Sequence, residues 1–334
     1  MPSIPARRSS TTLWNLVKII LAIVLVGYVV SRTSIEQLRS MLAHISVSWL
    51  VGYVILFLSL TLLKALQYYY LNGEGVSFPS VLNVVVMQNV VTNYFASTAG
   101  IASYIVLFRA EHGVKVSRAA IVFLLTKIGD LIILWISLCV SSFFVWQTIE
   151  VFHNLVWALV LGIGGVILVF FLTILFRRDF VSLVTKLLDV LRLSRISLIQ
   201  KGIGTLEVLS DIELRKVARI VWVAFFLSTI YFVLSVDWIY VSFMTFNFQQ
   251  DIQSVIFVSV MLQLISYVPI QVFGGLGITE TSVMYFWHPF HVQQDQIASV
   301  MIGIRLLFYI MNLVPLLYLP IYTAFLRPKD NHPQ

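Results

Sequence analysis

The sequence predicts an all-α, polytopic integral membrane protein that forms a single membrane domain over residues 1–334. Of its 334 residues, 59% are hydrophobic and only 11% are charged, and the mean hydropathy is +0.94. Several apolar runs are long enough to cross a bilayer as helices. Two further apolar segments contain polar residues, glycine or proline that interrupt a helix. We therefore expect six full transmembrane helices and two re-entrant helical hairpins, arranged as an inverted repeat.

The full transmembrane helices are expected at residues 12–31, 45–71, 119–145, 152–176, 220–246 and 296–325. No small-residue cleavage site follows the first run, so we expect this helix to be retained. The single cysteine, Cys139, lies inside an apolar run. It excludes an intrachain disulfide and gives no information about the redox compartment.

The two interrupted segments are residues 81–108 and 254–287. The second contains Pro269 and a glycine cluster, Gly274, Gly275 and Gly277. Irregular backbone in hydrocarbon leaves amides and carbonyls without partners, so it occurs only where protein or a water-filled cavity covers it. We therefore expect each segment to form two short helices joined by a turn that faces the protein interior.

Lysine and arginine predict the orientation, because they are enriched in cytoplasmic loops. They occur before the first helix, at 109–118, throughout 177–219 and at the C-terminal end, whereas the connections around Glu150 and Asp251 have none. Both termini are then cytoplasmic. This holds only if each interrupted segment enters and leaves on one side, the first from the cytoplasm and the second from outside.

The connection 177–219 is too long for a tight turn. Leucines alternate with basic residues at helical spacing in its first part, which indicates an amphipathic connector on the cytoplasmic surface. The net charge of +7 is concentrated there. Anionic lipid headgroups explain it better than nucleic acid, because no nucleic-acid-binding motif accompanies it.

We therefore expect two copies of one arrangement (helix, helix, hairpin, helix), at residues 12–145 and 152–325. When Gly100 is aligned with Gly277, Lys127 follows by 27 residues and Arg305 by 28. Inverted repeats with broken helices are typical of secondary transporters. The alternative is that glycine-rich membrane segments resemble one another by composition alone.

Charged residues inside predicted helices are candidates for function because they are costly to insert. Lys127 and Asp130 lie three residues apart and can pair on one helix face, as a structural ion pair or as part of a site. Arg305 has no acidic neighbour on its own helix, and Glu280 is its expected partner across the bundle. That pair would hold the second hairpin, or Arg305 would keep donors for an anionic headgroup.

Asn89 and Asn93 present two amides on one face of the first hairpin, for a ligand or for interhelical hydrogen bonds. Lys18 and Lys64 lie close enough to helix ends to reach the interface and are set aside. The predicted substrate-binding residues are Asn89, Asn93, Lys127, Asp130, Gly274, Gly275, Gly277, Glu280 and Arg305.

The sequence contains no P-loop, no H-E-x-x-H zinc motif and no G-x-S-x-G nucleophile elbow. His288 and His291 flank Pro289, which is poor geometry for a shared metal. We therefore expect no cofactor, no metal, no catalytic residue and no enzymatic activity.

Two segments resemble the family of lysylphosphatidylglycerol synthase transmembrane regions, also called flippase-like proteins. They are "VPIQVFGGLGITE" (268–280) and "IASVMIGIRLLFYIMNLVPLLYLP" (from 297); "GVKVSRAAIVFLLTKIGDLI" (113–132) resembles that family's first half. The resemblance implies a bacterial or archaeal inner-membrane protein that acts on an amphiphilic lipid. Relatives often have Glu and Arg soon after the first-half glycine, where this chain has Ile101 and Tyr104. No loop or tail has room for the synthase's aminoacyl-transfer domain, so we do not expect an aminoacyl transferase.

We expect a flippase-like protein that binds and translocates an anionic phospholipid or polyprenyl-linked glycolipid, without an ATPase of its own. The alternative is an integral-membrane glycosyltransferase or an accessory subunit of envelope assembly, for which Glu36 and Asp237 are the only outward acidic candidates. A structural partner of another envelope protein is the third interpretation. The lipid and the oligomeric state are left open.

Overall fold

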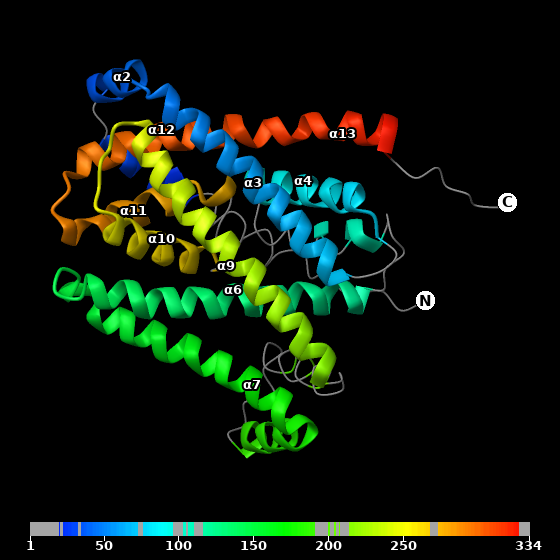
Figure 1. Cartoon of the computed structure of the whole chain (residues 1–334). Helices are drawn as coiled ribbons and strands as arrows, with labels where there is room; N and C mark the ends of the chain where they lie inside the picture. Colours follow the sequence, from blue (N-terminus) through cyan, green and yellow to red (C-terminus); the bar gives the residue numbers. More distant parts are fainter. Residues whose placement is uncertain are drawn as a thin grey trace, which may run out of the picture.

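The computed structural model describes residues 20, 23–32, 35–72, 76–95, 103–104, 106–109, 116–190, 200, 204, 207, 214–267 and 273–326. These residues form helices and no strand (Figure 1), which confirms the all-α prediction. The long helices are α3 (Val47–Asn72), α6 (Val116–Phe144), α7 (His153–Val190), α9 (Leu214–Thr245) and α12 (Gln294–Leu313). The shorter elements are α2 (Ile35–Ala43), α4 (Phe78–Tyr94), α10 (Ile252–Ser266), the 3₁₀ turn η2 (Phe273–Gly275), α11 (Ile278–Trp287) and α13 (Tyr318–Ile321).

Five helical stretches in the described residues are long and apolar enough to cross a membrane. They are Val47–Leu71, Phe123–Phe144, Glu150–Asp189, Ile220–Thr245 and Gln294–Ala324, and they match five of the six predicted spans. The remaining span, 12–31, lies largely outside the described residues, although residues 23–31 are helical. Large apolar side chains on the outer surfaces of these helices, such as Phe143 and Leu161, are consistent with a lipid environment.

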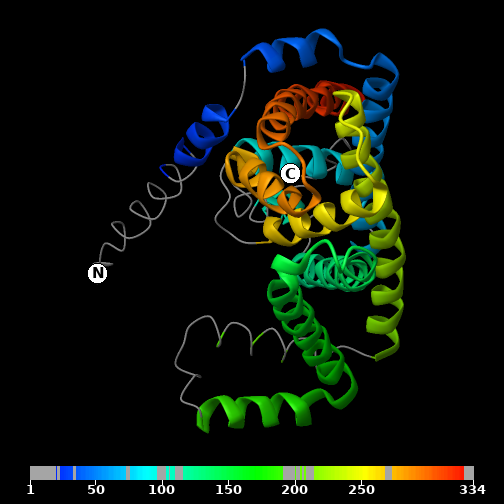
Figure 2. The same ribbon diagram turned by 90° about the vertical axis from the view of Figure 1, so that its left-hand side faces the viewer.

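A kink divides α7 into two parts. Arg177 has φ 50° and ψ −129°, outside the helical region, and the chain turns sharply there (Figure 2). Residues 178–190 continue as a helix with Leu183, Lys186 and Leu187 exposed. This helix coincides with the beginning of the predicted amphipathic connector 177–219, most of whose later residues lie outside the described part of the chain.

The first interrupted segment turns back on itself. Tyr104 and Phe108 are fully buried in one cluster with Val81 and Val84, near the beginning of α4. The chain after the interruption therefore returns alongside the helix that precedes it. The interruption itself, including Gly100, lies outside the described residues.

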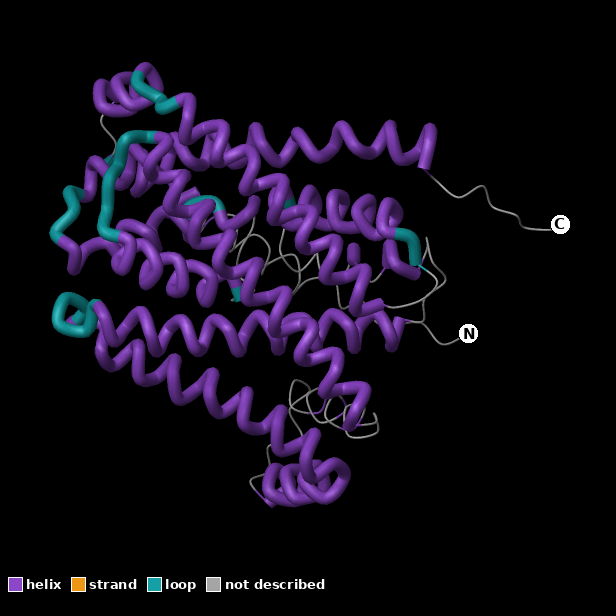
Figure 3. The backbone as a smooth tube through the Cα atoms, in the orientation of Figure 1, coloured by secondary structure: helices purple, strands orange, loops and turns teal. Residues whose placement is uncertain are grey.

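The second interrupted segment has the same form. Helices α10 and α11 pack together and run in opposite directions, so that α10 begins and α11 ends at the same end of the molecule (Figures 1 and 3). α10 ends at Ser266, and Pro269, which was expected to end it, lies just outside the described residues. α11 begins at Ile278.

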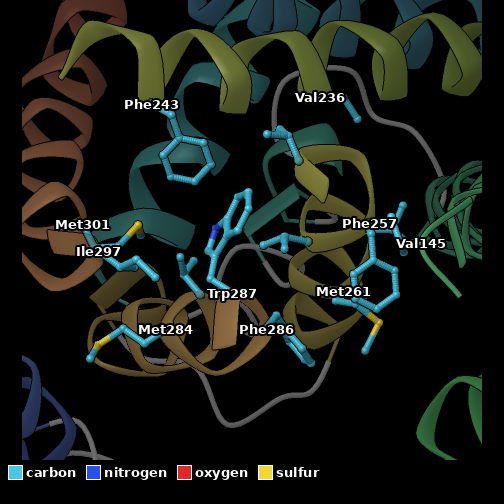
Figure 4. Packing of buried hydrophobic residues seen from close by; sticks show 14 of the residues in the cluster. Val145, Val236, Phe243, Phe257, Met261, Met284, Phe286, Trp287, Ile297 and Met301 are labelled. Atoms are coloured by element: carbon cyan, nitrogen blue, oxygen red, sulfur yellow. The ribbon is translucent and has the colours of Figure 1, made fainter. Parts of the chain in front are cut away.

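The largest apolar cluster packs this second segment against the spanning helices. Trp287, at the end of α11, is fully buried and lies beside Phe243 of α9 (Figure 4), with ring centroids 5.8 Å apart. On the other side of the bundle, α6 and α9 approach closely, because a Cβ on Gly129 would lie 3.1 Å from the backbone of Ala224. α10 packs against α6 on one side and α11 on the other.

Candidate functional site

The glycine cluster forms a tight turn before α11. Gly274, Gly275 and Gly277 have φ values of 64°, 80° and 81°, a region that side chains other than glycine seldom adopt. Phe273, with φ 51°, adopts it as well. The prediction that these glycines permit an irregular backbone is confirmed.

Glu280 closes this turn from the first turn of α11. One carboxylate oxygen, Oε2, accepts a hydrogen bond of 2.6 Å from the Gly277 amide at the helix N-terminus. The other oxygen, Oε1, accepts from Nε of Arg305 on α12, so the predicted pairing of these two residues is confirmed. Both side chains are largely buried, with 4% and 11% of their surfaces exposed. An ion pair this buried needs both partners, because either charge alone would be costly.

Arg305 also contacts the turn itself. Its Nη1 donates to the carbonyl oxygen of Gly274 at 3.0 Å, and Tyr309 donates through its hydroxyl to the carbonyl oxygen of Phe273 at 2.6 Å. The guanidinium carbon lies 5.4 Å from the ring centre of Phe308. The two side chains of α12 therefore hold the glycine turn in place.

The described ends of the two interrupted segments touch. The Phe273 amide donates to the carbonyl oxygen of Phe95 at 2.9 Å, and a Cβ on Gly274 would lie 2.7 Å from the carbonyl oxygen of Asn93. The Asn93 amide donates to Asn312 of α12. Position 274 therefore requires glycine, because the backbone of α4 occupies the space that a Cβ would need.

A cavity of about 220 Å³ lies beside this turn. Glu280 and Arg305 line one part of it, and Val26, Val29 and Val30 of the first helix line another. The surface that faces the cavity is almost entirely apolar, and the charged groups of Glu280 and Arg305 are paired with each other behind one wall.

A second charged cluster lies where α3, α6 and α9 meet. Lys64 and Lys127 both donate to Oδ2 of Asp130, at 3.3 and 3.4 Å, which confirms the predicted Lys127–Asp130 pair. Oδ1 of Asp130 accepts from the Ser228 hydroxyl at 2.6 Å. Lys64 was expected to reach the interface near a helix end, and this was wrong: its side chain is only 14% exposed. A partner on another helix holds it inside the bundle.

The predicted site residues therefore separate into two groups. Gly277, Glu280 and Arg305 line the cavity and Asn93 and Gly274 lie at the contact between the segments, whereas Lys127 and Asp130 do not line the cavity. Lys127 belongs to the second charged cluster and Arg305 to the cavity wall. The other members also have defined positions: Gly275 is buried in the turn and Asn89 is half-buried on α4.

The alternative acidic candidates lie apart from these groups. Glu36 on α2 and Asp237 on α9 are both exposed. Within the described ranges, no group of three or more His, Cys, Asp or Glu side chains is arranged to hold a metal ion.

Long apolar helices with charged residues at interrupted segments inside the bundle define a multi-pass integral membrane protein. The chain belongs to the family described as the lysylphosphatidylglycerol synthase TM region, which matches residues 15–315. This membership indicates a membrane protein involved in lipid handling. No curated protein and no solved structure shows significant similarity to the chain.

Proposed function

We propose that this protein binds an amphiphilic anionic lipid and moves it across the cytoplasmic membrane of a bacterium or archaeon. The observation behind the proposal is the apolar cavity beside the glycine turn, with the buried Glu280–Arg305 pair behind one wall. The side formed by Val26, Val29 and Val30 suits an acyl or prenyl chain, and the ion pair places charge close to a bound lipid. The proposal includes no chemical step and no ATPase.

A headgroup needs polar groups at membrane depth, because it cannot cross hydrocarbon unaided. Arg305 has five N–H donors, and its hydrogen bonds to Glu280 and Gly274 use two of them. A headgroup that reached the guanidinium would find the remaining donors in the planar geometry that arginine favours for phosphate oxygens. The cavity itself offers a place for the apolar part of a lipid.

The proposed topology has six spans and two re-entrant hairpins, with both termini in the cytoplasm. Its support is that α10 begins and α11 ends at the same end of the molecule, whereas α4 and residues 106–109 return at the opposite end (Figure 1). Within the membrane this arrangement makes each interrupted segment a hairpin, and the hairpins would enter from opposite faces.

An inverted repeat is part of the same proposal. Helices α6 and α12 begin at opposite ends of the molecule (Figure 1), and Lys127 and Arg305 each lie eleven residues after the first residue of their helix. Counted from the predicted spans 119–145 and 296–325, Lys127 and Arg305 are eight and nine residues inside, which at 1.5 Å per residue is about 12 and 14 Å into a bilayer core of about 30 Å. Two residues at equivalent positions of an inverted repeat would lie at similar depths from opposite faces, as Lys127 and Arg305 do in this topology.

The test is lipid movement in proteoliposomes containing the purified protein and a fluorescent anionic phospholipid. We expect the wild type to accelerate flipping, and Val26→Trp, which fills the cavity, to abolish most of the acceleration. Val24→Trp is the matched control, because Val24 lies on the same helix, is 60% exposed and does not line the cavity. The proposal fails if the wild type moves neither anionic phospholipids nor a polyprenyl phosphate, or if Val26→Trp is as active as the control.

A further inference from the structure

The second charged cluster, Lys64, Lys127 and Asp130, has two cations for one carboxylate. Both amines share the same oxygen of Asp130, so the cluster has a formal charge of +1. Among the described residues, Asp130 is the acidic partner of both lysines. By contrast, Glu280 and Arg305 form a one-to-one pair with no net charge.

The two lysines are held very differently. Lys64 donates to Gln67 at 2.8 Å as well as to Asp130, and Gln67 donates to Ser228, which in turn donates to Asp130. Lys64 and Asp130 are therefore fixed in a closed ring of hydrogen bonds. The ring is neutral, so among the described residues the charge of Lys127 is left uncompensated, which is costly in the low dielectric of a membrane protein interior.

Lys127 is the accessible member of the cluster. Its side chain is 36% exposed, and its contact with Asp130, at 3.4 Å, is long for a charged hydrogen bond. Its amine lies over the ring of Tyr267, 5.2 Å from the centroid, and Tyr267 is the residue that ends α10. Lys127 thus lies beside the second hairpin, and within the described residues its amine makes one hydrogen bond, to Asp130.

The cluster and the cavity lie on different helices around this hairpin. α10 packs against both α6, which contains Lys127, and α11, which contains Glu280 (Figures 1 and 2). A headgroup in the cavity and an anion at Lys127 would therefore occupy separate positions next to one hairpin.

We propose that Lys64, Lys127 and Asp130 form a phosphate-binding site, in which the Lys64 ring neutralises Asp130 and the charge left on Lys127 binds one singly charged phosphate group. The chemistry matches a phosphodiester, whose single negative charge neutralises the cluster. The inference rests on the proposed function, because it assigns the lipid's phosphate to this cluster and leaves Glu280–Arg305 to hold the glycine turn.

The experiment measures binding to the full-length protein in uncharged detergent micelles. The probes are dioctanoyl phosphatidylglycerol, dioctanoylglycerol, which has no phosphate, and inorganic phosphate. We expect the wild type to prefer the phospholipid over dioctanoylglycerol by about tenfold or more, as one charge-assisted hydrogen bond would give. Lys127→Gln should reduce this preference to less than about twofold, and Lys127→Arg should restore it.

Lys186→Gln is the matched control for charge, because Lys186 is exposed on the helix after the α7 kink. It should bind like the wild type. An unchanged melting temperature in Lys127→Gln shows that the variant is folded, as its partial exposure predicts. If millimolar inorganic phosphate displaces the phospholipid from the wild type, the site also accepts free phosphate, which supports the same chemistry.

The inference is overturned if Lys127→Gln keeps the tenfold preference, or if the wild type binds both lipids equally. In those cases the proposed function stands if Val26→Trp still abolishes lipid binding. If the wild type binds no lipid and flips none, the proposed function fails as well. The two failures therefore give different results.

Discussion

Neutralising Glu280 isolates the contribution of the buried ion pair. Glu280→Gln keeps the size of the side chain and an oxygen that can accept from the Gly277 amide, so it mainly removes the charge that faces Arg305. Breaking a buried pair costs about 3–5 kcal/mol, because the remaining charge has no partner. Arg305 is 11% exposed and keeps its bond to Gly274, so we expect the lower part of this range, about 3 kcal/mol.

Arg305→Gln should cost a similar amount, and the double variant should cost less than the two single variants together. Contacting residues in one network show interaction energies of about 0.5–3 kcal/mol, and this pair belongs in the upper half. The assay is reversible unfolding in mixed micelles, followed by tryptophan fluorescence. Additive losses, or a Glu280→Gln variant within about 0.5 kcal/mol of the wild type, would refute the reasoning.

Three further predictions test the packing. Gly274→Ala should destabilise the protein by more than about 2 kcal/mol, because φ is 64° and the new Cβ would lie 2.7 Å from the Asn93 carbonyl oxygen. Gly165→Ala is the control, because the space around Gly165 is open. Equal stabilities of the two variants would contradict the turn. Asn93→Ala should cost only about 0.6–1.7 kcal/mol, the range for hydrogen bonds between membrane helices, and a larger loss in the same unfolding assay would indicate a further role. Gly129→Leu should lower the melting temperature by several degrees, because a Cβ at this position would lie 3.1 Å from the Ala224 backbone, and a wild-type melting curve would argue against that contact.

Much of the architecture follows from composition alone. Apolar runs predicted five spans that match stretches of the structure, with close bounds for four and with 152–176 ending near the kink inside Glu150–Asp189, since a bilayer requires about 20 apolar residues of each. The pairs Lys127–Asp130 and Glu280–Arg305 were also predictable, because a buried charge needs a partner and few were available. The residues' proposed contacts with substrate stay predictions.

The parts that sequence could not supply depend on contacts between distant helices. Lys64 lies near enough to the end of its apolar run to suggest an interfacial position, and only the fold shows Asp130, 66 residues away, beside it. Likewise, the bond between Phe273 and Phe95 joins backbone atoms, which leave no pattern in side-chain spacing. Contacts between distant helices also place Lys127 and Arg305 in different clusters, which their sequence positions do not reveal.

The weak burial of α7 makes this helix responsive to the membrane. Only 11% of its apolar window is buried, so most of its surface is free to contact lipid, and its contacts with α6 hold it on one side. From His153 to the kink at Arg177 it is about 36 Å long, which requires a tilt of about 35° in a hydrocarbon core of about 30 Å. In a core of about 33 Å the tilt falls to about 24°, and the kink would move sideways by about 6 Å. The helix after Arg177 would thus register bilayer thickness as a displacement along the membrane surface.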